Sequence, residues 1–252
     1  MEKIQFDHLV FAWILLACII FLVLLKIPAP YGRHTSKMWG VTVPNRMGWL
    51  LMELAALLPF LCFVFAGSRE KNSVVWIIVI LFSLHYVNRS LIYPFRIKTK
   101  NKRMPLAVVF MAVFFNTVNG FLNGYYLGSL QNQYSIDWFK HPFFISGFIL
   151  FVIGMIINMS ADNQLIQLRK NSMNGYQIPG GLLFSKVSCP NFLGEIIEWG
   201  GFALLCWSWP AVSFFIWTLC NLVPRALDHH RWYKNKFNDY PAERKAVFPY
   251  LL

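Results

Sequence analysis

The chain consists of long runs of apolar residues separated by short segments rich in proline, glycine and charge. A helix that crosses a bilayer needs roughly 20 mostly apolar residues, and most of the runs reach or approach that length. The pattern predicts an all-α protein, a seven-span integral membrane helical bundle. The predicted spans cover residues 9–25, 47–66, 74–92, 105–127, 143–159, 192–207 and 211–223. The last two are short, and a single hairpin buried in the bundle is the alternative for them.

Composition agrees with this class. Of the 252 residues, 57% are hydrophobic and only 13% are charged, whereas an ordinary soluble domain carries about 25% charged residues. A separate soluble domain, a disulfide scaffold and a disordered chain are therefore excluded, and we expect residues 1–252 to form a single membrane domain. The net charge of +12 would suggest nucleic-acid binding in a soluble protein, but basic cytosolic loops explain it better here.

The distribution of Lys and Arg predicts the orientation. With the N-terminus outside, 19 of the 23 basic residues lie in segments on the cytosolic side. The positive-inside rule therefore favours an external N-terminus and a cytosolic C-terminus. No internal repeat is visible in the sequence, which argues against a transporter built from duplicated halves.

Polar side chains recur inside the predicted spans of the first half of the chain. Such groups cost free energy in a bilayer, so they face a bundle interior or a cavity. They are Glu53 in the second span, Tyr86, Arg89 and Tyr93 on one helical stripe of the third, and Asn116, Asn119 and Asn123 on one stripe of the fourth. The competing interpretations are a structural ion pair for the glutamate, an interfacial belt for the tyrosines and interhelical hydrogen bonds for the asparagines.

A second polar set lies in the C-terminal half, near the predicted cytosolic side. It comprises Asn158, Asp162 and Arg169 on one face, Tyr176, then Asn191, Glu195 and Glu198 on another, and finally Arg225, His229 and Tyr233. This mixture of cations, amides and acids suits a phosphate-bearing, hydroxyl-rich ligand such as a nucleotide cofactor. A solvated surface turn and a basic amphipathic helix on the membrane are the competing interpretations. We also expect Asn191 to cap the start of its helix.

No metal site is expected. His229 and His230 are adjacent and therefore point to different faces of a helix, and no cysteine or carboxylate lies at a useful spacing from them.

Several motifs together resemble the steroid 5α-reductase family (3-oxo-5α-steroid 4-dehydrogenase). The resemblance covers nearly the whole chain and is densest at INMSADNQLIQLRK, YQIPGGLLFSKVSCPNFLGEIIEWGGFAL and RALDHHRWYKNKFNDYPAERKAVFP. YGRHT, LHYVNRSLIYP and NGFLNGYYL add to it. The family has a seven-span helical fold, which agrees with the charge distribution.

The resemblance implies NADPH-dependent reduction of the 4,5 double bond of testosterone-like or progesterone-like 3-oxo-Δ4 steroids. Tyr86 and Glu53 match the catalytic pair that holds and polarises the 3-keto oxygen, and Arg89, Tyr93 and Asn119 complete the implied substrate-binding set. The implied NADPH-binding residues are Asn158, Asp162, Arg169, Tyr176, Asn191, Glu195, Arg225, His229 and Tyr233. Residues 1–135 would then be mostly the substrate side and 136–252 mostly the cofactor side.

Two departures from the family pattern stand out. Met52 stands where the mammalian enzymes carry a glutamine, which puts the fine steroid selectivity in doubt. The segment 94–105 is more basic and differently spaced, which leaves its cofactor contacts unassigned.

Other functions remain as alternatives. A reductase of another unsaturated lipid, such as an enoyl-CoA or a polyprenol, shares much of the C-terminal signature, but Glu53 and Tyr86 suit a ketone oxygen better. A membrane methyltransferase would leave Arg169 and Arg225 without a phosphate, and a lipid-binding or transport protein is the non-enzymatic alternative. We expect a monomer that takes a steroid or sterol-like substrate from the bilayer and contacts membrane lipid, without metal or nucleic acid. Its membrane would be the endoplasmic reticulum in a eukaryote or the inner membrane in a bacterium.

Overall fold

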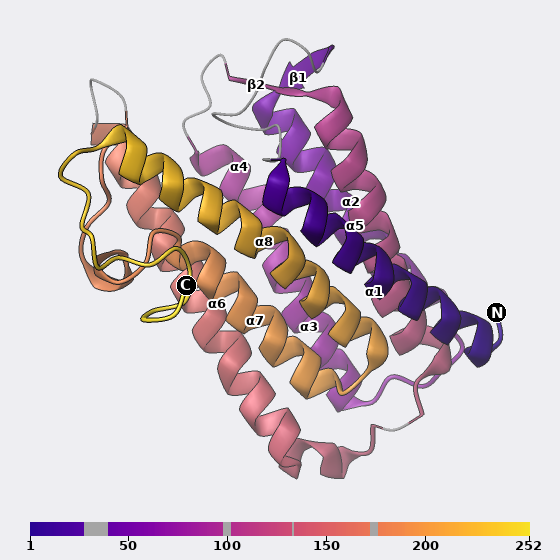
Figure 1. Ribbon diagram of the computed structural model, residues 1–252. Coiled ribbons are helices and arrows are strands. Elements are labelled where there is room, and N and C mark those ends of the chain that lie inside the picture. The colour runs from indigo at the N-terminus through magenta and orange to yellow at the C-terminus, as the bar shows by residue number, and fades with distance from the viewer. Residues whose placement is uncertain (28–39, 98–101, 133, 172–175) are drawn as a thin grey trace. The chain divides into compact units, whose positions relative to one another are not determined.

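The computed structural model describes the whole chain except residues 28–39, 98–101, 133 and 172–175 (Figure 1). The described part is mostly helical. The α-helices are α1 (Lys3–Lys26), α2 (Asn45–Ala66), α3 (Ser73–Val87), α4 (Tyr93–Arg96), α5 (Leu106–Tyr125), α6 (Pro142–Asn171), α7 (Pro190–Cys206) and α8 (Trp209–Lys236). Two π-helical turns (Asn88–Ile92, Tyr126–Leu130), two 3₁₀ turns (Ile136–Lys140, Leu182–Ser185) and two strands, β1 (Thr42–Pro44) and β2 (Arg103–Pro105), complete it.

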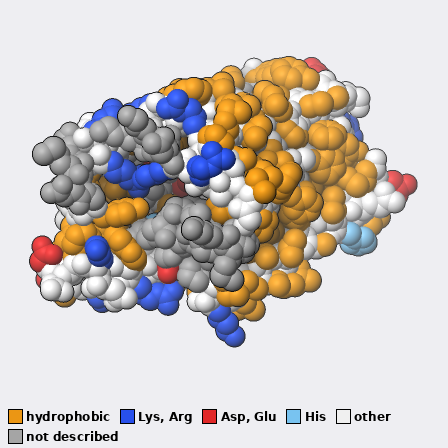
Figure 2. Space-filling model, turned by 90° about the horizontal axis from the view of Figure 1, so that it is seen from above, with side chains coloured by type: hydrophobic (Ala, Val, Ile, Leu, Met, Phe, Trp, Pro, Cys, Tyr) orange, Lys and Arg blue, Asp and Glu red, His pale blue; other side chains and the backbone are white. Residues whose placement is uncertain are grey.

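Six helical segments of the described chain are long and apolar enough to cross a membrane. They are Lys3–Lys26, Asn45–Ala66, Ser73–Arg96, Leu106–Leu130, Pro142–Lys170 and Trp209–Lys236. Figure 2 shows hydrophobic side chains over a broad area of the face on view, and large apolar residues such as Leu15, Phe114 and Ile156 are exposed. These features fit a multi-pass membrane protein. The sixth predicted span, residues 192–207, corresponds to α7, which has only 17 residues, and the seventh, residues 211–223, lies within α8.

The helices divide between two compact units. Unit 1 comprises Met1–Val10, Ala29–Ile145 and Leu205–Ala211, and unit 2 comprises Phe11–Pro28, Ser146–Leu204 and Val212–Leu252.

A glycine stripe on α5 and on the π-helical turn that follows it packs against α2 in unit 1. Gly120, Gly124 and Gly128 recur every four residues, so they share one helical face. A Cβ atom at each would meet the backbone of α2, at Ala56, Phe60 and Phe63 respectively. The two helices lie side by side (Figure 1) with their backbones in direct contact, as in the small-xxx-small packing of membrane helices.

A short antiparallel strand pair, which the all-α prediction did not include, precedes α2 and α5. Val43 of β1 is paired with Met104 of β2, and the backbone N–H of Leu106 donates to Val41 at 2.8 Å. Since each strand runs directly into its helix, the pair ties together the N-terminal ends of α2 and α5.

The third predicted span continues beyond its predicted end at residue 92. A π-helical turn follows α3, in which the N–H of Tyr93 donates to the carbonyl of Asn88. Pro94 explains this turn, because it has no N–H to donate one turn back and its ring disfavours regular helix before it. The hydroxyl of Ser90 donates to the carbonyl of Tyr86 at 2.6 Å inside this segment.

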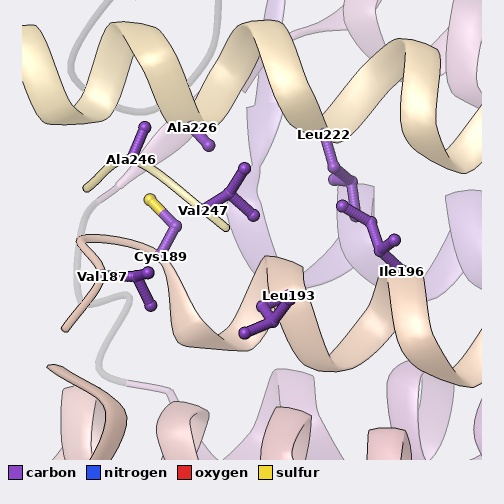
Figure 3. Packing of buried hydrophobic residues seen from close by; sticks show 8 residues of the cluster. All are labelled: Val187, Cys189, Leu193, Ile196, Leu222, Ala226, Ala246 and Val247. Atoms are coloured by element: carbon purple, nitrogen blue, oxygen red, sulfur yellow. The ribbon is translucent and has the colours of Figure 1, made fainter. Parts of the chain in front are cut away.

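Unit 2 contains the closely packed helices α6, α7 and α8. A Cβ atom at Gly154 of α6 would meet the backbone of Glu198 of α7, and one at Gly201 of α7 would meet that of Phe151. The other side of α7 packs on α8 through a cluster of buried hydrophobic residues (Figure 3). The cluster consists of Val187, Cys189, Leu193, Ile196, Leu222, Ala226, Ala246 and Val247. The helix α8 continues through Pro224 to Lys236, past the predicted end of the last span at residue 223.

The α2–α5 contact can be tested with Gly124→Val. The added side chain would strike the backbone of Phe60, which cannot move without separating the helices. We expect a loss of about 1–3 kcal/mol of stability, as is typical for an overpacked interior, measured by thermal unfolding in detergent. Gly180→Ala is the control, because a methyl group there meets nothing within 4 Å. Equal melting temperatures for the two variants would contradict this packing.

Candidate functional site

A chain of amide hydrogen bonds ends on the hydroxyl of Tyr86 in unit 1. The side chain of Asn123 donates to the Oδ1 atom of Asn119 at 3.0 Å, and the Nδ2 atom of Asn119 donates to the Tyr86 hydroxyl oxygen at 3.3 Å. Asn119 is only 2% exposed and Tyr86 only 3%. A phenol hydroxyl both donates and accepts, so this contact uses the oxygen as acceptor and leaves its hydrogen to be donated to another group.

The same turn of α5 contacts α2 next to Glu53. Asn116, almost one turn before Asn119, donates from Nδ2 to the carbonyl of Met52 at 2.7 Å. This bond confirms the interhelical interpretation for Asn116. One turn of α5 therefore contacts both Met52 on α2, the residue before the half-buried Glu53, and the buried Tyr86 on α3.

Aromatic side chains pack against the ring of Tyr86. The rings of Phe60 and Phe82 stack with centroids 3.9 Å apart, and the ring of Phe82 lies 4.7 Å from that of Tyr86. Such packing on both the ring and the hydroxyl restricts the side chain to one orientation.

Arg89 and Tyr93 form a stacked group with Trp49. The Arg89 guanidinium lies 4.7 Å from the centroid of the Tyr93 ring and 5.1 Å from that of Trp49, and the two rings meet edge to face at 5.6 Å. Sequence reasoning missed Trp49, although its position one turn before Glu53 on α2 was a usable signal. The π-helical turn separates Tyr93 from Tyr86, so the predicted common stripe holds only in part.

In unit 2 the predicted faces of α6 and α7 meet in a polar network. Asn158 donates to the carbonyl of Asn191 at 3.0 Å and to Oε2 of Glu195 at 3.4 Å. Asn191 donates to Oδ1 of Asp162 at 3.2 Å. Because a Cβ atom at Gly194 would strike the backbone of Asn158, glycine is what permits this approach.

The expected cap at Asn191 is wrong. The helix α7 begins at Pro190, so Asn191 is already inside it, and its side chain crosses to α6 instead.

The predicted residues of α8 contact neighbouring parts of unit 2. Arg225 donates from Nη2 to Oδ1 of Asn221 at 3.4 Å. The ring of His229 lies 5.7 Å from that of Phe192, the residue after Asn191, so His229 lies beside the start of α7.

The last three predicted residues of unit 2, Tyr233, Tyr176 and Arg169, differ in their exposure and contacts. The buried ring of Tyr233 stacks on Tyr240 with centroids 5.3 Å apart and an interplanar angle of 13°. Tyr176 is exposed, with its ring 5.0 Å from Trp232. Arg169 is exposed two turns beyond Asp162, near the end of α6.

The two clusters differ in chemistry. Unit 1 presents a phenol and a carboxylate among apolar helices, a combination that suits a ketone or another weak acceptor. Unit 2 presents amides, carboxylates and arginines, which suit hydroxyl and phosphate groups. Among the residues that the structure describes, no group of three or more His, Cys, Asp or Glu side chains could hold a metal ion.

Comparison with known proteins gives a consistent result. The model of a family described as 3-oxo-5-alpha-steroid 4-dehydrogenase matches residues 102–252. The chain is 41% identical over 253 residues to 3-oxo-5-alpha-steroid 4-dehydrogenase 1 of Mus musculus, covering 100% of this chain and 98% of that one. It is 40% identical over 231 residues to steroid 5-alpha-reductase DET2 of Gossypium hirsutum, covering 88% of each.

A relative from a primate is similar to the chain to the same degree. Identity to 3-oxo-5-alpha-steroid 4-dehydrogenase 1 of Macaca fascicularis is 43% over 223 residues, which is 88% of this chain and 84% of the relative. The matches to relatives extend across unit 1 as well, beyond the range of the family model. The chain therefore belongs to the 3-oxo-5-alpha-steroid 4-dehydrogenase family.

Proposed function

We propose that this protein uses NADPH to reduce the 4,5 double bond of 3-oxo-Δ4 steroids of the testosterone and progesterone type. The observation that carries the proposal is the buried hydroxyl of Tyr86, which the amide of Asn119 holds in place. When carbon 5 of such a steroid gains a hydride, negative charge develops on the 3-oxygen, and carbon 4 is then protonated. A preorganised donor at that oxygen stabilises the charge where it develops.

Tyr86 acts in this proposal as the donor to the 3-keto oxygen, with Glu53 orienting it or sharing the contact. Asn119 supports the role, because its amide donates to the phenol oxygen and so does not use the hydroxyl hydrogen. Arg89 and Tyr93, stacked with Trp49, are assigned to the wall of the substrate pocket.

The residues of unit 2 fit NADPH, which supplies the hydride when bound. The network of Asn158, Asp162, Asn191 and Glu195 offers amide donors and carboxylate acceptors to ribose and carboxamide groups. Arg169 and Arg225 would pair with phosphates, while Tyr176, His229 and Tyr233 offer ring faces and polar tips.

The two ligands then belong mainly to different units. The substrate residues named above all lie in unit 1, and the NADPH residues all lie in unit 2. We infer that residues 1–252 work as one functional membrane domain with this division, which follows the units more closely than a boundary at residue 135.

The proposal also includes the number of membrane spans and the sides on which the two termini lie. At 17 residues, α7 is about 26 Å long, close to the roughly 30 Å hydrocarbon core. Its contacts with α6 and α8 in unit 2 support a role as the sixth of seven spans. An external N-terminus and a cytosolic C-terminus then follow from the distribution of basic residues, and the membrane would be that of the endoplasmic reticulum in a eukaryotic cell.

Tyr86→Phe tests the catalytic assignment. The change deletes only the hydroxyl, so packing with Phe82 should survive while the rate of hydride transfer falls roughly 100-fold to 1000-fold. The measurement is single-turnover oxidation of NADPH with testosterone, normalised to folded protein. Tyr125→Phe is the matched control, since that hydroxyl contacts only the chain terminus among the bonds described. A rate for Tyr86→Phe within about threefold of the wild type, far short of that range, would refute the assignment.

The cofactor assignment predicts a strong preference for NADPH over NADH. One charge-assisted hydrogen bond to the 2′-phosphate contributes about 1.5–3 kcal/mol, or roughly 10-fold to 100-fold in kcat/KM. Arg169→Ala should raise the KM for NADPH and leave the steroid KM unchanged. Lys236→Ala, which removes another exposed cation from the end of a helix, serves as control. Equal kcat/KM values for the two nucleotides would exclude this arrangement.

The seven-span topology predicts that a reporter fused after Leu252 reads as cytosolic, and that a tag before Met1 lies in the lumen, where sealed vesicles of the endoplasmic reticulum protect it from impermeant reagents. The measurement is reporter activity or tag protection in sealed vesicles. Both ends on the same side would show an even number of spans.

A further inference from the structure

A buried polar cluster at Ser188 has no part in the chemistry described above. The Ser188 hydroxyl oxygen lies 2.6 Å from the hydroxyl of Tyr240, 2.7 Å from Nδ1 of His230 and 3.0 Å from the carbonyl of Lys245. Ser188 is 4% exposed and Tyr240 is 8% exposed. A serine hydroxyl offers one hydrogen and two lone pairs, so these three partners use its full hydrogen-bonding capacity.

The cluster joins three segments that are distant in sequence. Ser188 precedes α7, His230 lies on α8, and Tyr240 belongs to the segment that follows α8. The backbone adds to the connection, because the N–H of Ser188 donates to Lys245 at 2.8 Å and that of Cys189 donates to Ala246 at 3.1 Å. Figure 3 shows Val187 and Cys189 beside Ala246 and Val247 at this contact.

The segment 237–247 also contacts parts of the proposed NADPH site. The ring of Tyr240 stacks on that of Tyr233. Arg244, which is buried, donates from Nη1 to the carbonyl of Pro179 at 3.1 Å, next to the loop at Gly180. This segment therefore contacts α8, the start of α7 and the loop before it.

We propose that Ser188 and Tyr240 are positioning residues for NADPH, an inference that rests on the proposed function of unit 2. Ser188 lies three residues before Asn191, so its bonds to Tyr240 and His230 fix where α7 starts relative to α8. Tyr240 fixes the ring of Tyr233 by stacking and is itself held by Ser188. His230 is next to His229 on α8, so its bond to Ser188 fixes the rotation of α8 about its own axis beside the start of α7.

The test compares Tyr240→Phe and Ser188→Ala with the control Thr218→Ala. Tyr240→Phe keeps the ring that stacks on Tyr233 and removes only the bond to Ser188. Thr218→Ala deletes another buried hydroxyl of unit 2, whose hydrogen bond in the described part of the chain stays within α8, to the carbonyl of Phe214 at 3.0 Å. The measurements are the Kd for NADPH, the KM for NADPH, the KM for testosterone, kcat and the melting temperature without ligand.

We expect both cluster variants to raise the Kd and KM for NADPH by about tenfold, the equivalent of one hydrogen bond. The steroid KM should stay unchanged and kcat should fall less than the affinity does. Thr218→Ala should keep the wild-type Kd even if its melting temperature falls. His230→Asn, whose amide can still donate to Ser188, should lose less affinity than His230→Ala.

The inference would be overturned if the melting temperature of the cluster variants fell while their Kd for NADPH stayed within about twofold of the wild type, a shift well below one hydrogen bond. The cluster would then be merely structural. If Ser188→Ala gives no folded protein, Tyr240→Phe alone decides. Wild-type protein that binds no NADPH would overturn the proposed function together with this inference. Wild-type binding with unchanged variants would overturn this inference only.

Discussion

Direct contact between helix backbones at glycine is the constraint on which both candidate sites depend. In a bilayer the hydrophobic effect does not drive helices together, so association relies on close packing and on hydrogen bonds between helices. In unit 1, Gly120 and Gly124 each follow an asparagine of the amide chain, at 119 and 123. In unit 2, Gly194 lies between Asn191 and Glu195 and touches the backbone of Asn158. A larger side chain at any of these glycines would move the polar groups out of hydrogen-bonding range.

The sequence predicted the helices and the polar faces well, because both depend on local periodicity. Asn158 and Asp162 share a face of α6, and their partners Asn191 and Glu195 share a face of α7, as their spacing indicated. The pairing itself was beyond reach, because a spacing on one helix does not say which other helix it meets. The hydrogen bond from Asn119 to Tyr86 joins residues 33 positions apart and depends on tertiary packing.

Other features left signals that were not used. Pro94 could have indicated the irregular helix before it, and the recurrence of glycine in NGFLNGYYLG indicated a close contact with some other helix. The pair of three-residue strands left too short a pattern to detect. For α7 the difficulty is its length: the apolar run at 192–207 predicted a short span, and the helix of 17 residues remains below the roughly 20 that a span needs.

The structure shows what the side chain of Met52, a departure from the family pattern, contacts. Its side chain is buried in an apolar cluster with Met104 of β2 and Val109 of α5. Its carbonyl accepts the hydrogen bond from Asn116. The backbone contact is independent of the side chain at this position, so a glutamine there would retain it. The side chain bears instead on the packing of α2, one residue from Glu53.

The two units also solve the problem of polarity in a membrane in different ways. The chain of amides and the phenol in unit 1 are neutral, so burial among apolar helices costs far less than burial of a charge. A ketone oxygen needs only such a neutral donor until charge develops on it. Phosphates need cations, and cations are stable where they keep their water, as the exposure of Arg169 allows. The neutral donors of unit 1 and the exposed arginine of unit 2 thus suit the charge of the group that each is proposed to bind and how much water can reach it.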